Sequence, residues 1–322
     1  MPDFLPRDPY ISPTNRVMSD VPDAFWGPAL TALRARLELP PGPWRRLPTG
    51  KNVVLELGDE AILKLIPPCW AEDAGREAAA LRLVPAGGPV ATPALLASEE
   101  LEGWTVLLLQ RMPGAILAER WQSLEGAQRV RLVAQLGAAA AWLHSVPVPE
   151  GSPLPYDWAA HLRQDMEDAP RQLSVAGAPQ ALQDSWDGFL RSVGPLPAPD
   201  SRLVLLHGDL SFGNVLVQEH AGDLRVTGLL DFGDASLGEA VHDWLSPGVH
   251  NFGGDAAVVN AFFDGYGLPR SERTPALQSH LLARSLLYYG WGYLARKFPL
   301  AEATSWAEVA GVVWPMASMA GE

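Results

Sequence analysis

One polar segment between short apolar runs constrains the fold of this 322-residue chain more than any other feature. It contains His207, Gly208 and Asp209, then Asn214, and a second aspartate, Asp231, follows further along the chain. Short apolar runs flank these residues and have the length and composition of β-strands: 203–206, 215–217 and 226–230. In an ordinary hairpin, Asp, Asn and Gly at such places serve only to make turns. Three spaced polar residues in this strand context favour a functional loop instead.

The chemistry that needs this set of groups is phosphoryl transfer from ATP. One carboxylate, here Asp209, orients the acceptor hydroxyl and accepts its proton. An amide oxygen and a second carboxylate, here Asn214 and Asp231, hold magnesium against the phosphates. The segment therefore predicts a kinase-type catalytic loop with ATP and Mg2+ as cofactors.

The pattern His-Gly-Asp-x4-Asn, followed by Asp-Phe-Gly-Asp at 231–234, resembles the aminoglycoside phosphotransferase and choline kinase superfamily, which shares the protein-kinase fold. Protein kinases usually carry His-Arg-Asp in this loop, so Gly208 indicates the small-molecule branch. The run 238–244, which contains Asp243, is similar to the segment that follows the metal aspartate in that branch. The resemblance implies that His207 braces the loop by hydrogen bonding and that Asp243 anchors it from behind.

A lysine and a glutamate upstream belong to the predicted nucleotide site. Lysine is rare in this chain, yet Lys64 lies inside the β-rich apolar run 61–66. A compact ammonium on a flexible stem suits contact with the α- and β-phosphates. Glu77 lies in a strongly helix-forming segment, and in the kinase fold such a glutamate pairs with the strand lysine. Glu72 is an alternative partner, and both Lys64 and Glu77 could instead be ordinary surface charges.

Weaker signals suggest two further parts of the nucleotide site. A turn between two predicted strands contains Gly50, and we expect Gly50 and Asn52 to contact the nucleotide. This turn matches neither a Gly-x-Gly-x-x-Gly loop nor a Walker loop. By the resemblance, the next long strand ends in a hinge where the Gln110 carbonyl and the Met112 amide bond the adenine edge. A plain strand-to-helix connection would leave the same signal in the sequence.

These assignments imply an α+β, protein-kinase-like fold with two lobes. An N-terminal antiparallel sheet with one helix forms the nucleotide-binding lobe, and a larger, mostly helical C-terminal lobe performs catalysis and binds the acceptor. Apolar periodicity in the second lobe predicts long helices, one of them over 275–297. The predicted parts are an N-terminal arm at 1–23, the nucleotide-binding lobe at 24–110, a hinge at 111–114 and the catalytic lobe at 115–322.

Composition restricts the partners. A net charge of −13 argues against binding to nucleic acid or to anionic membranes. The N-terminus has no apolar core typical of a signal peptide, and no apolar run reaches the length of a membrane span. A chain that is 48% apolar can bury the core of two lobes, and its single cysteine excludes an internal disulfide. We expect a cytoplasmic monomer.

The acceptor is less constrained than the catalytic core. The N-terminal layout and the Asp-Phe-Gly-Asp run look most like hygromycin B phosphotransferases, which implies a hydroxylated, cationic aminoglycoside as acceptor and a role in antibiotic resistance. Acidic side chains could receive its ammonium groups: Asp165, Glu167, Asp168, Asp234, Glu239 and Asp264. Choline-, homoserine- or macrolide-type kinases share the same core, and a nucleotide-binding pseudokinase is a further alternative.

Overall fold

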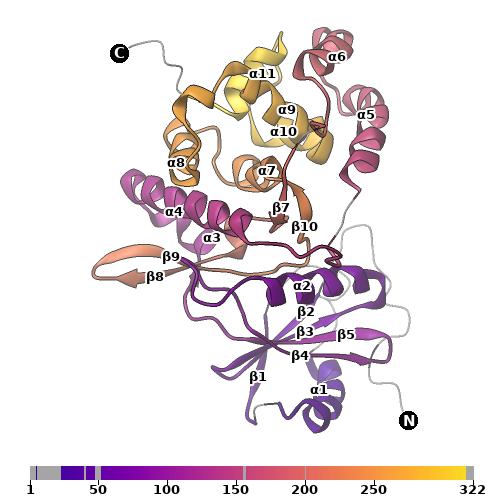
Figure 1. Ribbon diagram of the computed structural model, residues 1–322, viewed down its shortest axis with the longest axis vertical. Helices are drawn as coiled ribbons and strands as arrows, with labels where there is room; N and C mark the ends of the chain where they lie inside the picture. The colour runs from indigo at the N-terminus through magenta and orange to yellow at the C-terminus, as the bar shows by residue number, and fades with distance from the viewer. Residues whose placement is uncertain are drawn as a thin grey trace. The chain divides into compact units, whose positions relative to one another are not determined.

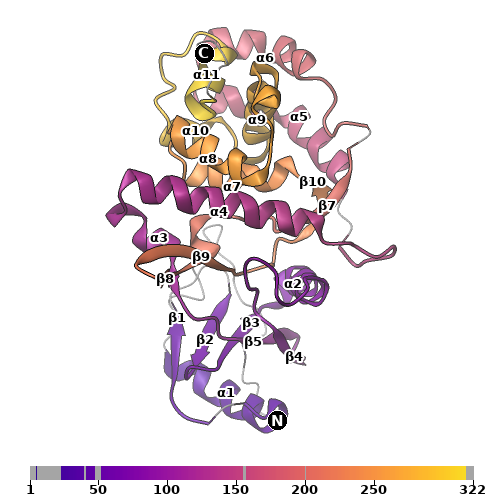
Figure 2. The same cartoon turned by 60° about the vertical axis from the view of Figure 1, so that its left-hand side comes forward.

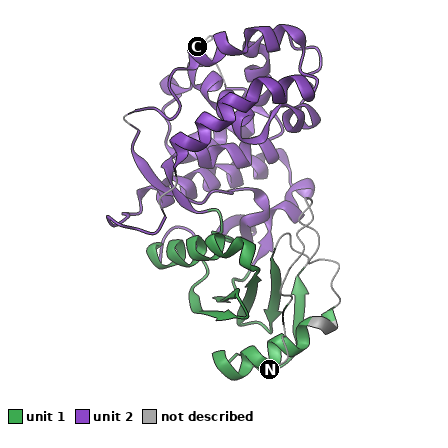
Figure 3. Ribbon diagram, turned by 90° about the vertical axis from the view of Figure 1, so that its right-hand side faces the viewer, with its two compact units in different colours: residues 1–86, 92–113, 230–234 green, residues 87–91, 114–229, 235–322 purple. Residues whose placement is uncertain are grey.

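The computed structural model describes residues 5, 23–39, 41–47, 52–154, 157–199 and 201–316. The chain divides into two compact units. Unit 1 comprises residues 1–86, 92–113 and 230–234, and unit 2 comprises residues 87–91, 114–229 and 235–322 (Figure 3). The segment 230–234 thus belongs to unit 1, although the chain on both sides of it belongs to unit 2. Gly50 and most of the predicted N-terminal arm lie outside the described residues.

Unit 1 is built on a five-stranded antiparallel sheet with strand order β1-β2-β3-β5-β4 (Figure 1). Its elements are α1 (Asp23–Leu37), β1 (Trp44–Leu47), β2 (Val53–Leu57), β3 (Ala61–Ile66), the 3-10 turn η2 (Pro68–Trp70), α2 (Ala71–Leu83), β4 (Leu95–Leu101) and β5 (Trp104–Gln110).

Alternation along β3 gives the sheet two different faces. Leu63 and Leu65 point into an apolar core that also contains Trp26 and Leu30 of α1. Lys64 lies between them in sequence, so its side chain points to the opposite face, where it contacts α2. The two helices therefore lie on opposite faces of the sheet (Figure 1). The face covered by α1 stabilises the unit, and the face covered by α2 carries the polar groups.

Unit 2 contains two small sheets, with strand orders β10-β7 and β6-β8-β9, and most of the helices. In Figure 2, α4 runs along α8. The strands are β6 (Ala115–Ile116), β7 (Leu203–Leu206), β8 (Val215–His220), β9 (Asp223–Leu229) and β10 (Ser236–Glu239). The helices are α3 (Leu117–Arg120), α4 (Gly126–Ser145), α5 (Trp158–Val175), α6 (Gln180–Val193), α7 (Val241–His250), α8 (Ala256–Tyr266), α9 (Pro275–Tyr289), α10 (Trp291–Lys297) and α11 (Trp306–Val313), with 3-10 turns η3 (Trp121–Ser123), η4 (Phe212–Asn214) and η5 (Arg270–Glu272).

The single helix predicted over 275–297 is wrong, because the chain forms two helices, α9 and α10, separated at Gly290. Gly290 has φ 76° and ψ 158°, outside the helical region. Glycine adopts such a conformation without the steric cost that a Cβ would bring. Apolar residues continue at helical spacing on both sides of Gly290, so periodicity alone did not reveal the break.

The α+β class, the antiparallel sheet of unit 1 and the helical character of unit 2 confirm the predicted fold. The sheet carries α2 as expected, and α1 is an additional helix in unit 1. Within the part of the chain that the structure describes, no helix is both long enough and apolar enough to cross a bilayer.

Candidate active site

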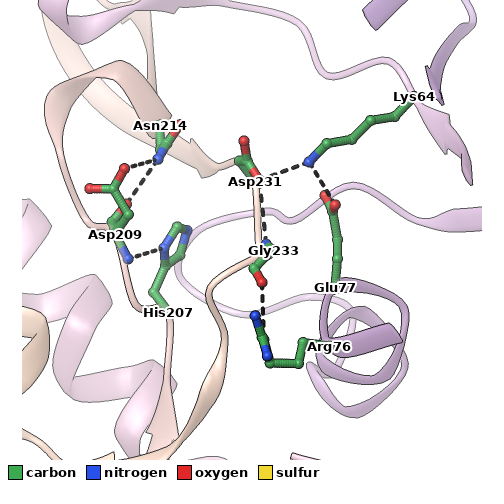
Figure 4. A network of polar contacts seen from close by, with 8 residues as sticks. All are labelled: Lys64, Arg76, Glu77, His207, Asp209, Asn214, Asp231 and Gly233. Carbon is green, nitrogen blue, oxygen red and sulfur yellow. Dashed lines mark hydrogen bonds and ion pairs between the residues drawn. The ribbon is translucent and has the colours of Figure 1, made fainter. Parts of the chain in front are cut away.

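In unit 1, the ammonium of Lys64 lies between two carboxylates (Figure 4). Its Nζ is 2.6 Å from Oε2 of Glu77 and 2.8 Å from Oδ1 of Asp231. Burial alone would lower the pKa of Lys64, but the charges of Asp231 and Glu77 more than offset this effect and raise it. Lys64 is therefore a charged ammonium held by two anions.

The two carboxylates differ in exposure. The side chain of Glu77 is 2% exposed, whereas that of Asp231 is 50% exposed. Glu77 is therefore a fixed internal partner that aims the lysine, as predicted for a helix glutamate. The carboxylate of Asp231 is accessible from solvent, so a ligand can take the place of Lys64 beside it. Glu72, the alternative partner for the lysine, lies beside Arg76 instead.

Helix α2 also holds the segment that carries Asp231. The Nε of Arg76 donates to the carbonyl oxygen of Gly233 at 3.3 Å (Figure 4). The backbone N–H of Phe232 also donates to Glu77. Asp231 itself has a left-handed backbone, with φ 61°, a region that Asp tolerates better than most residues. These contacts explain why residues 230–234 belong to unit 1.

In unit 2, the loop between β7 and β8 is anchored to α7 by Asp243. Its two carboxylate oxygens accept the backbone N–H groups of His207 and Gly208, each at 2.8 Å. Gly208 has φ 87°, a conformation that glycine adopts without strain. The anchor is completely buried. Asp243 therefore fixes the backbone immediately before Asp209, which is the anchoring contact expected for it.

Asp243 also accepts a hydrogen bond from a histidine. Nε2 of His144 lies 2.9 Å from Oδ2 of Asp243, and Nδ1 of the same ring lies 2.8 Å from the hydroxyl of Tyr266. Burial alone would raise the pKa of Asp243, but hydrogen bonding and charge from His144, with help from His207, lower it. The buried anchor is thereby kept as a carboxylate, which is the form that accepts both backbone N–H groups.

The orientation of Asn214 is set by Asp209. Nδ2 of Asn214 donates to the Asp209 carbonyl oxygen at 2.9 Å and to Oδ2 of its carboxylate at 3.0 Å (Figure 4). Both contacts need the amide nitrogen, so the amide oxygen is directed away from Asp209. An oxygen is the ligand that a hard cation prefers. The amide oxygen of Asn214 is thus not used by Asp209, and its role as a magnesium ligand stays a prediction.

Comparison with known proteins identifies the family. The sequence profile described as the phosphotransferase enzyme family matches residues 49–277, which is well over half of the chain. This chain belongs to the phosphotransferase enzyme family. The resemblance noted from the sequence is thereby confirmed at the level of the family, and a hygromycin-type acceptor stays a prediction.

Solved structures of other phosphotransferases have a similar fold. The phosphotransferase resembles the GDP complex of wild-type aminoglycoside 2'-phosphotransferase-IIIa with a TM-score of 0.67 and 15% identity, over 89% of this chain and 96% of that one. For the streptomycin–ATP complex of APH(2")-IIa the TM-score is 0.61 at 16% identity, over 84% and 95% of the two chains. For the apoenzyme of a macrolide 2'-phosphotransferase from Brachybacterium faecium it is 0.55 at 21% identity, over 89% and 98%. At these identities the likeness concerns the fold.

The remaining predicted nucleotide contacts of the phosphotransferase are on unit 1. Asn52 is buried next to the start of β2. Gln110 ends β5 opposite Ala61, with its N–H donating to the Ala94 carbonyl oxygen at 2.8 Å. Met112 follows in the connection to unit 2 and is partly buried. Their contacts with a nucleotide, and the hinge role of 111–114, stay predictions.

Sequence reasoning gave no site role to several residues that the fold brings to Asp209. Ser246 of α7 donates to Oδ1 of Asp209 at 2.5 Å. The charge of Asp209 also acts on His250, Tyr289 and Tyr293, which identifies these groups as its neighbours. Burial lowers the pKa of His250, with the charge of Asp209 opposing this shift. The one hint in the sequence was that polar residues recur at helical spacing along α7, at Asp243, Ser246 and His250.

Two of the acidic residues expected to bind an acceptor have internal partners. Glu239 forms a buried ion pair with Arg284, and Asp264 lies 2.6 Å from the guanidinium of Arg273. The buried Glu239 does not fit the expected role in acceptor binding, whereas for Asp264, whose side chain is 46% exposed, that role stays a prediction. Asp165, in α5 with Glu167 and Asp168, is partly buried, and burial raises its pKa.

Proposed function

We propose that this phosphotransferase moves the γ-phosphoryl group of ATP to a hydroxyl of a small molecule, with magnesium as the metal. The observation that carries the proposal is the state of the four core polar groups. Lys64, Asp209, Asn214 and Asp231 are all present, and each is oriented by the hydrogen bonds described above. A binding-only pseudokinase would be expected to have lost at least one of them.

The four groups have different proposed roles. Lys64 would contact the phosphates, aimed by Glu77, while the exposed carboxylate of Asp231 and the amide oxygen of Asn214 would hold magnesium. Asn214 precedes Val215, which pairs with Leu229, and Asp231 follows Leu229 by two residues. Magnesium, when bound, supplies positive charge against the phosphate oxygens.

Asp209 is the residue that acts on the acceptor. Its carboxylate orients the acceptor hydroxyl and takes its proton while the hydroxyl oxygen bonds to the γ-phosphorus and the bond to the β-phosphate oxygen breaks. Where the transition state is loose, orientation is the larger part of this contribution.

For the acceptor we propose an aminoglycoside of the hygromycin type. Several structures of similar fold are aminoglycoside phosphotransferases, and the net charge of −13 favours a cationic partner. A macrolide is the second candidate. Tyr289 and Tyr293 beside Asp209 favour an acceptor with an apolar ring face, and a macrolide phosphotransferase is among the similar structures.

A transfer assay tests the proposal. The purified chain is incubated with magnesium and ATP labelled in the γ-phosphate, and with hygromycin B, other aminoglycosides, a macrolide, choline and homoserine. We expect labelled product with an aminoglycoside. Transfer only to choline or homoserine would instead identify a metabolic kinase, and ATP binding without any transfer would identify a pseudokinase. Growth of a sensitive bacterium expressing the chain on hygromycin B provides the parallel test in cells.

Two variants test the assigned roles. Asp209→Asn keeps the shape of the side chain but removes the base, so kcat should fall by roughly 10²–10⁴ with ATP binding retained. Asp187→Asn, an exposed carboxylate of α6, is the matched control and should keep wild-type kcat.

Asp231→Ala should abolish the rise in Tm that magnesium-ATP gives the wild type. An equal rise in the variant would contradict the metal role of Asp231.

A further inference from the structure

Helix α7 contacts the catalytic loop along most of its length. Asp243, Ser246 and His250 lie at positions i, i+3 and i+7 of this helix, and therefore on one face. Asp243 accepts the N–H groups of His207 and Gly208, and Ser246 donates to the next residue, Asp209. Asn251, directly after the helix, accepts the N–H of Phe212 at 2.9 Å. The helix thus sets the backbone of the loop and also the carboxylate of its key residue.

The hydroxyl of Ser246 is committed to that carboxylate. Ser246 is 2% exposed, and its Oγ lies 2.5 Å from Oδ1 of Asp209. An ionised carboxylate only accepts hydrogen bonds, so the serine must be the donor. A buried serine in a helix commonly bonds to a carbonyl of its own helix instead, as Ser285 does to Leu281 at 2.7 Å. Ser246 is therefore aimed out of α7 at Asp209.

The contacts to the two oxygens of Asp209 are unequal. Oδ1 accepts the Ser246 hydroxyl and, at 3.2 Å, the backbone N–H of Ser211. Oδ2 accepts the amide of Asn214 at 3.0 Å. A carboxylate oxygen has about two lone-pair positions. Oδ1 therefore has both positions occupied by protein donors, and Oδ2 keeps one for a further donor.

We infer that Ser246 is a positioning residue that makes Oδ2 of Asp209 the oxygen that receives the acceptor hydroxyl. This inference rests on the proposed role of Asp209. By holding Oδ1, the serine fixes the rotation of the carboxylate before the acceptor arrives, and the acceptor hydroxyl finds Oδ2 at a defined angle. Pre-set geometry of this kind increases kcat rather than binding.

Tyr289 of α9 supports Ser246 from behind. Burial raises the pKa of Tyr289, and a side-chain hydrogen bond with Ser246 opposes this shift. The phenol of Tyr289 is therefore a neighbour of the Ser246 hydroxyl. Tyr289→Phe removes the phenol oxygen beside Ser246 while keeping the ring, and should weaken the positioning without abolishing it.

The test compares Ser246→Ala with Ser285→Ala, a buried serine whose hydroxyl donates to Leu281 of its own helix and accepts the Trp314 indole N–H, so that neither bond involves Asp209. Ser246→Ala should lower kcat by about 10- to 100-fold, with the KM values for magnesium-ATP and acceptor changed by less than about twofold. Ser285→Ala should keep wild-type kcat even if its Tm falls. Ser246→Thr retains a hydroxyl and should recover most of the loss. Tyr289→Phe should give a kcat between those of the wild type and Ser246→Ala. If Ser246→Ala does not fold, Tyr289→Phe and Ser246→Thr test the inference in its place.

A double-mutant cycle separates positioning from a general structural effect. In an Asp209→Asn background, Ser246→Ala should cause little further loss of kcat, because the carboxylate that it positions is already gone. Equal losses in both backgrounds, or wild-type kcat in Ser246→Ala, would overturn the inference. Wild-type kcat in Asp209→Asn alone would instead overturn the proposed function, so the two failures are distinguishable.

Discussion

Glu239 and Arg284 form an ion pair in the interior of unit 2, with the guanidinium 2% exposed and the carboxylate 8% exposed. Glu239 also accepts the backbone N–H of Ala198 at 3.0 Å and the hydroxyl of Ser201 at 2.5 Å. It links the segment before β7 to helix α9. This carboxylate therefore serves the stability of the unit that holds the catalytic loop.

Removing the cation from this pair should be strongly destabilising. Arg284→Met leaves the Glu239 carboxylate buried without its counter-charge, and the free energy of unfolding should fall by about 3–5 kcal/mol. Glu239→Gln combined with Arg284→Met should recover part of that loss, because no buried charge remains. Urea unfolding measures both. Arg131→Met, which breaks an exposed pair with Asp223, is the control and should cost less than about 1 kcal/mol. Similar losses in the two single variants would contradict the assignment.

Gly208 should be needed for catalysis beyond its effect on stability. Alanine at φ 87° is strained by about 1–2 kcal/mol, and relief of that strain would move the N–H that Asp243 holds. Gly222→Ala is a matched control, since Gly222 has φ 82° with no heavy atom within 4 Å of an added Cβ. We expect similar decreases in Tm for both variants, and a large decrease in kcat only for Gly208→Ala. Equal kcat values in the two would exclude a role for the loop backbone.

His242 should make the stability depend on pH. The ring is buried, with centroids 4.1 Å from Trp158 and 4.9 Å from Tyr288. Burial lowers the pKa of His242 from 6.5 to about 4, with the charge of Asp243 opposing this shift and that of Arg284 adding to it. The folded state therefore keeps His242 neutral between these values, while the unfolded state takes up a proton.

The free energy of unfolding should accordingly fall as the pH drops from about 7 to about 4, and this contribution should level off below. Its full size is on the order of 3 kcal/mol. Urea unfolding at several pH values should show a shallower slope for His242→Gln than for the wild type. His220→Gln, at an exposed histidine of β8, should leave the slope unchanged. An unaltered slope in His242→Gln would contradict the buried, neutral state.

The parts of the site that could be predicted are those carried by local sequence. Asp209, Asn214 and Asp231 lie on a loop and a hairpin whose strands are recognisable from apolar runs, and Lys64 lies in a short β-rich run. The Lys64–Glu77 pair followed because a strand and the next helix are joined by a short connection. Local pattern was sufficient where contacts join neighbouring elements.

Contacts between distant elements could not be predicted in the same way. The bond from His144 to Asp243 joins α4 to α7, and nothing local to either residue reveals it. Ser246 left a weak signal, a polar residue three positions after Asp243 on the same helix face, but the direction of its hydroxyl depends on tertiary packing. The arginine partners of Glu239 and Asp264 were hidden for the same reason.

Salt should distinguish a cationic acceptor from a neutral one. The chain carries a net charge of −13, so its negative potential attracts a cationic aminoglycoside and concentrates it near the protein. Salt screens exposed charges over a Debye length of about 8 Å at physiological ionic strength. Between about 0.05 M and 0.5 M salt, the apparent KM for an aminoglycoside should therefore rise by roughly three- to tenfold. A macrolide, with at most one ammonium group, should show a much smaller change.

The measurement is initial-rate kinetics at saturating magnesium-ATP, with the KM for ATP determined at each salt concentration as the internal control. Glu167→Gln and Asp168→Asn, on α5, test whether the remaining acidic side chains of unit 2 contribute, because each should reduce the salt dependence for the aminoglycoside only. Glu239 and Asp264 are already paired with arginines, so these two α5 residues are tested first among the carboxylates expected from the sequence. A KM for the aminoglycoside that is independent of salt, alongside efficient transfer to it, would show that hydrogen bonds and ring contacts select the acceptor. The tyrosines beside Asp209 would then be the groups to vary.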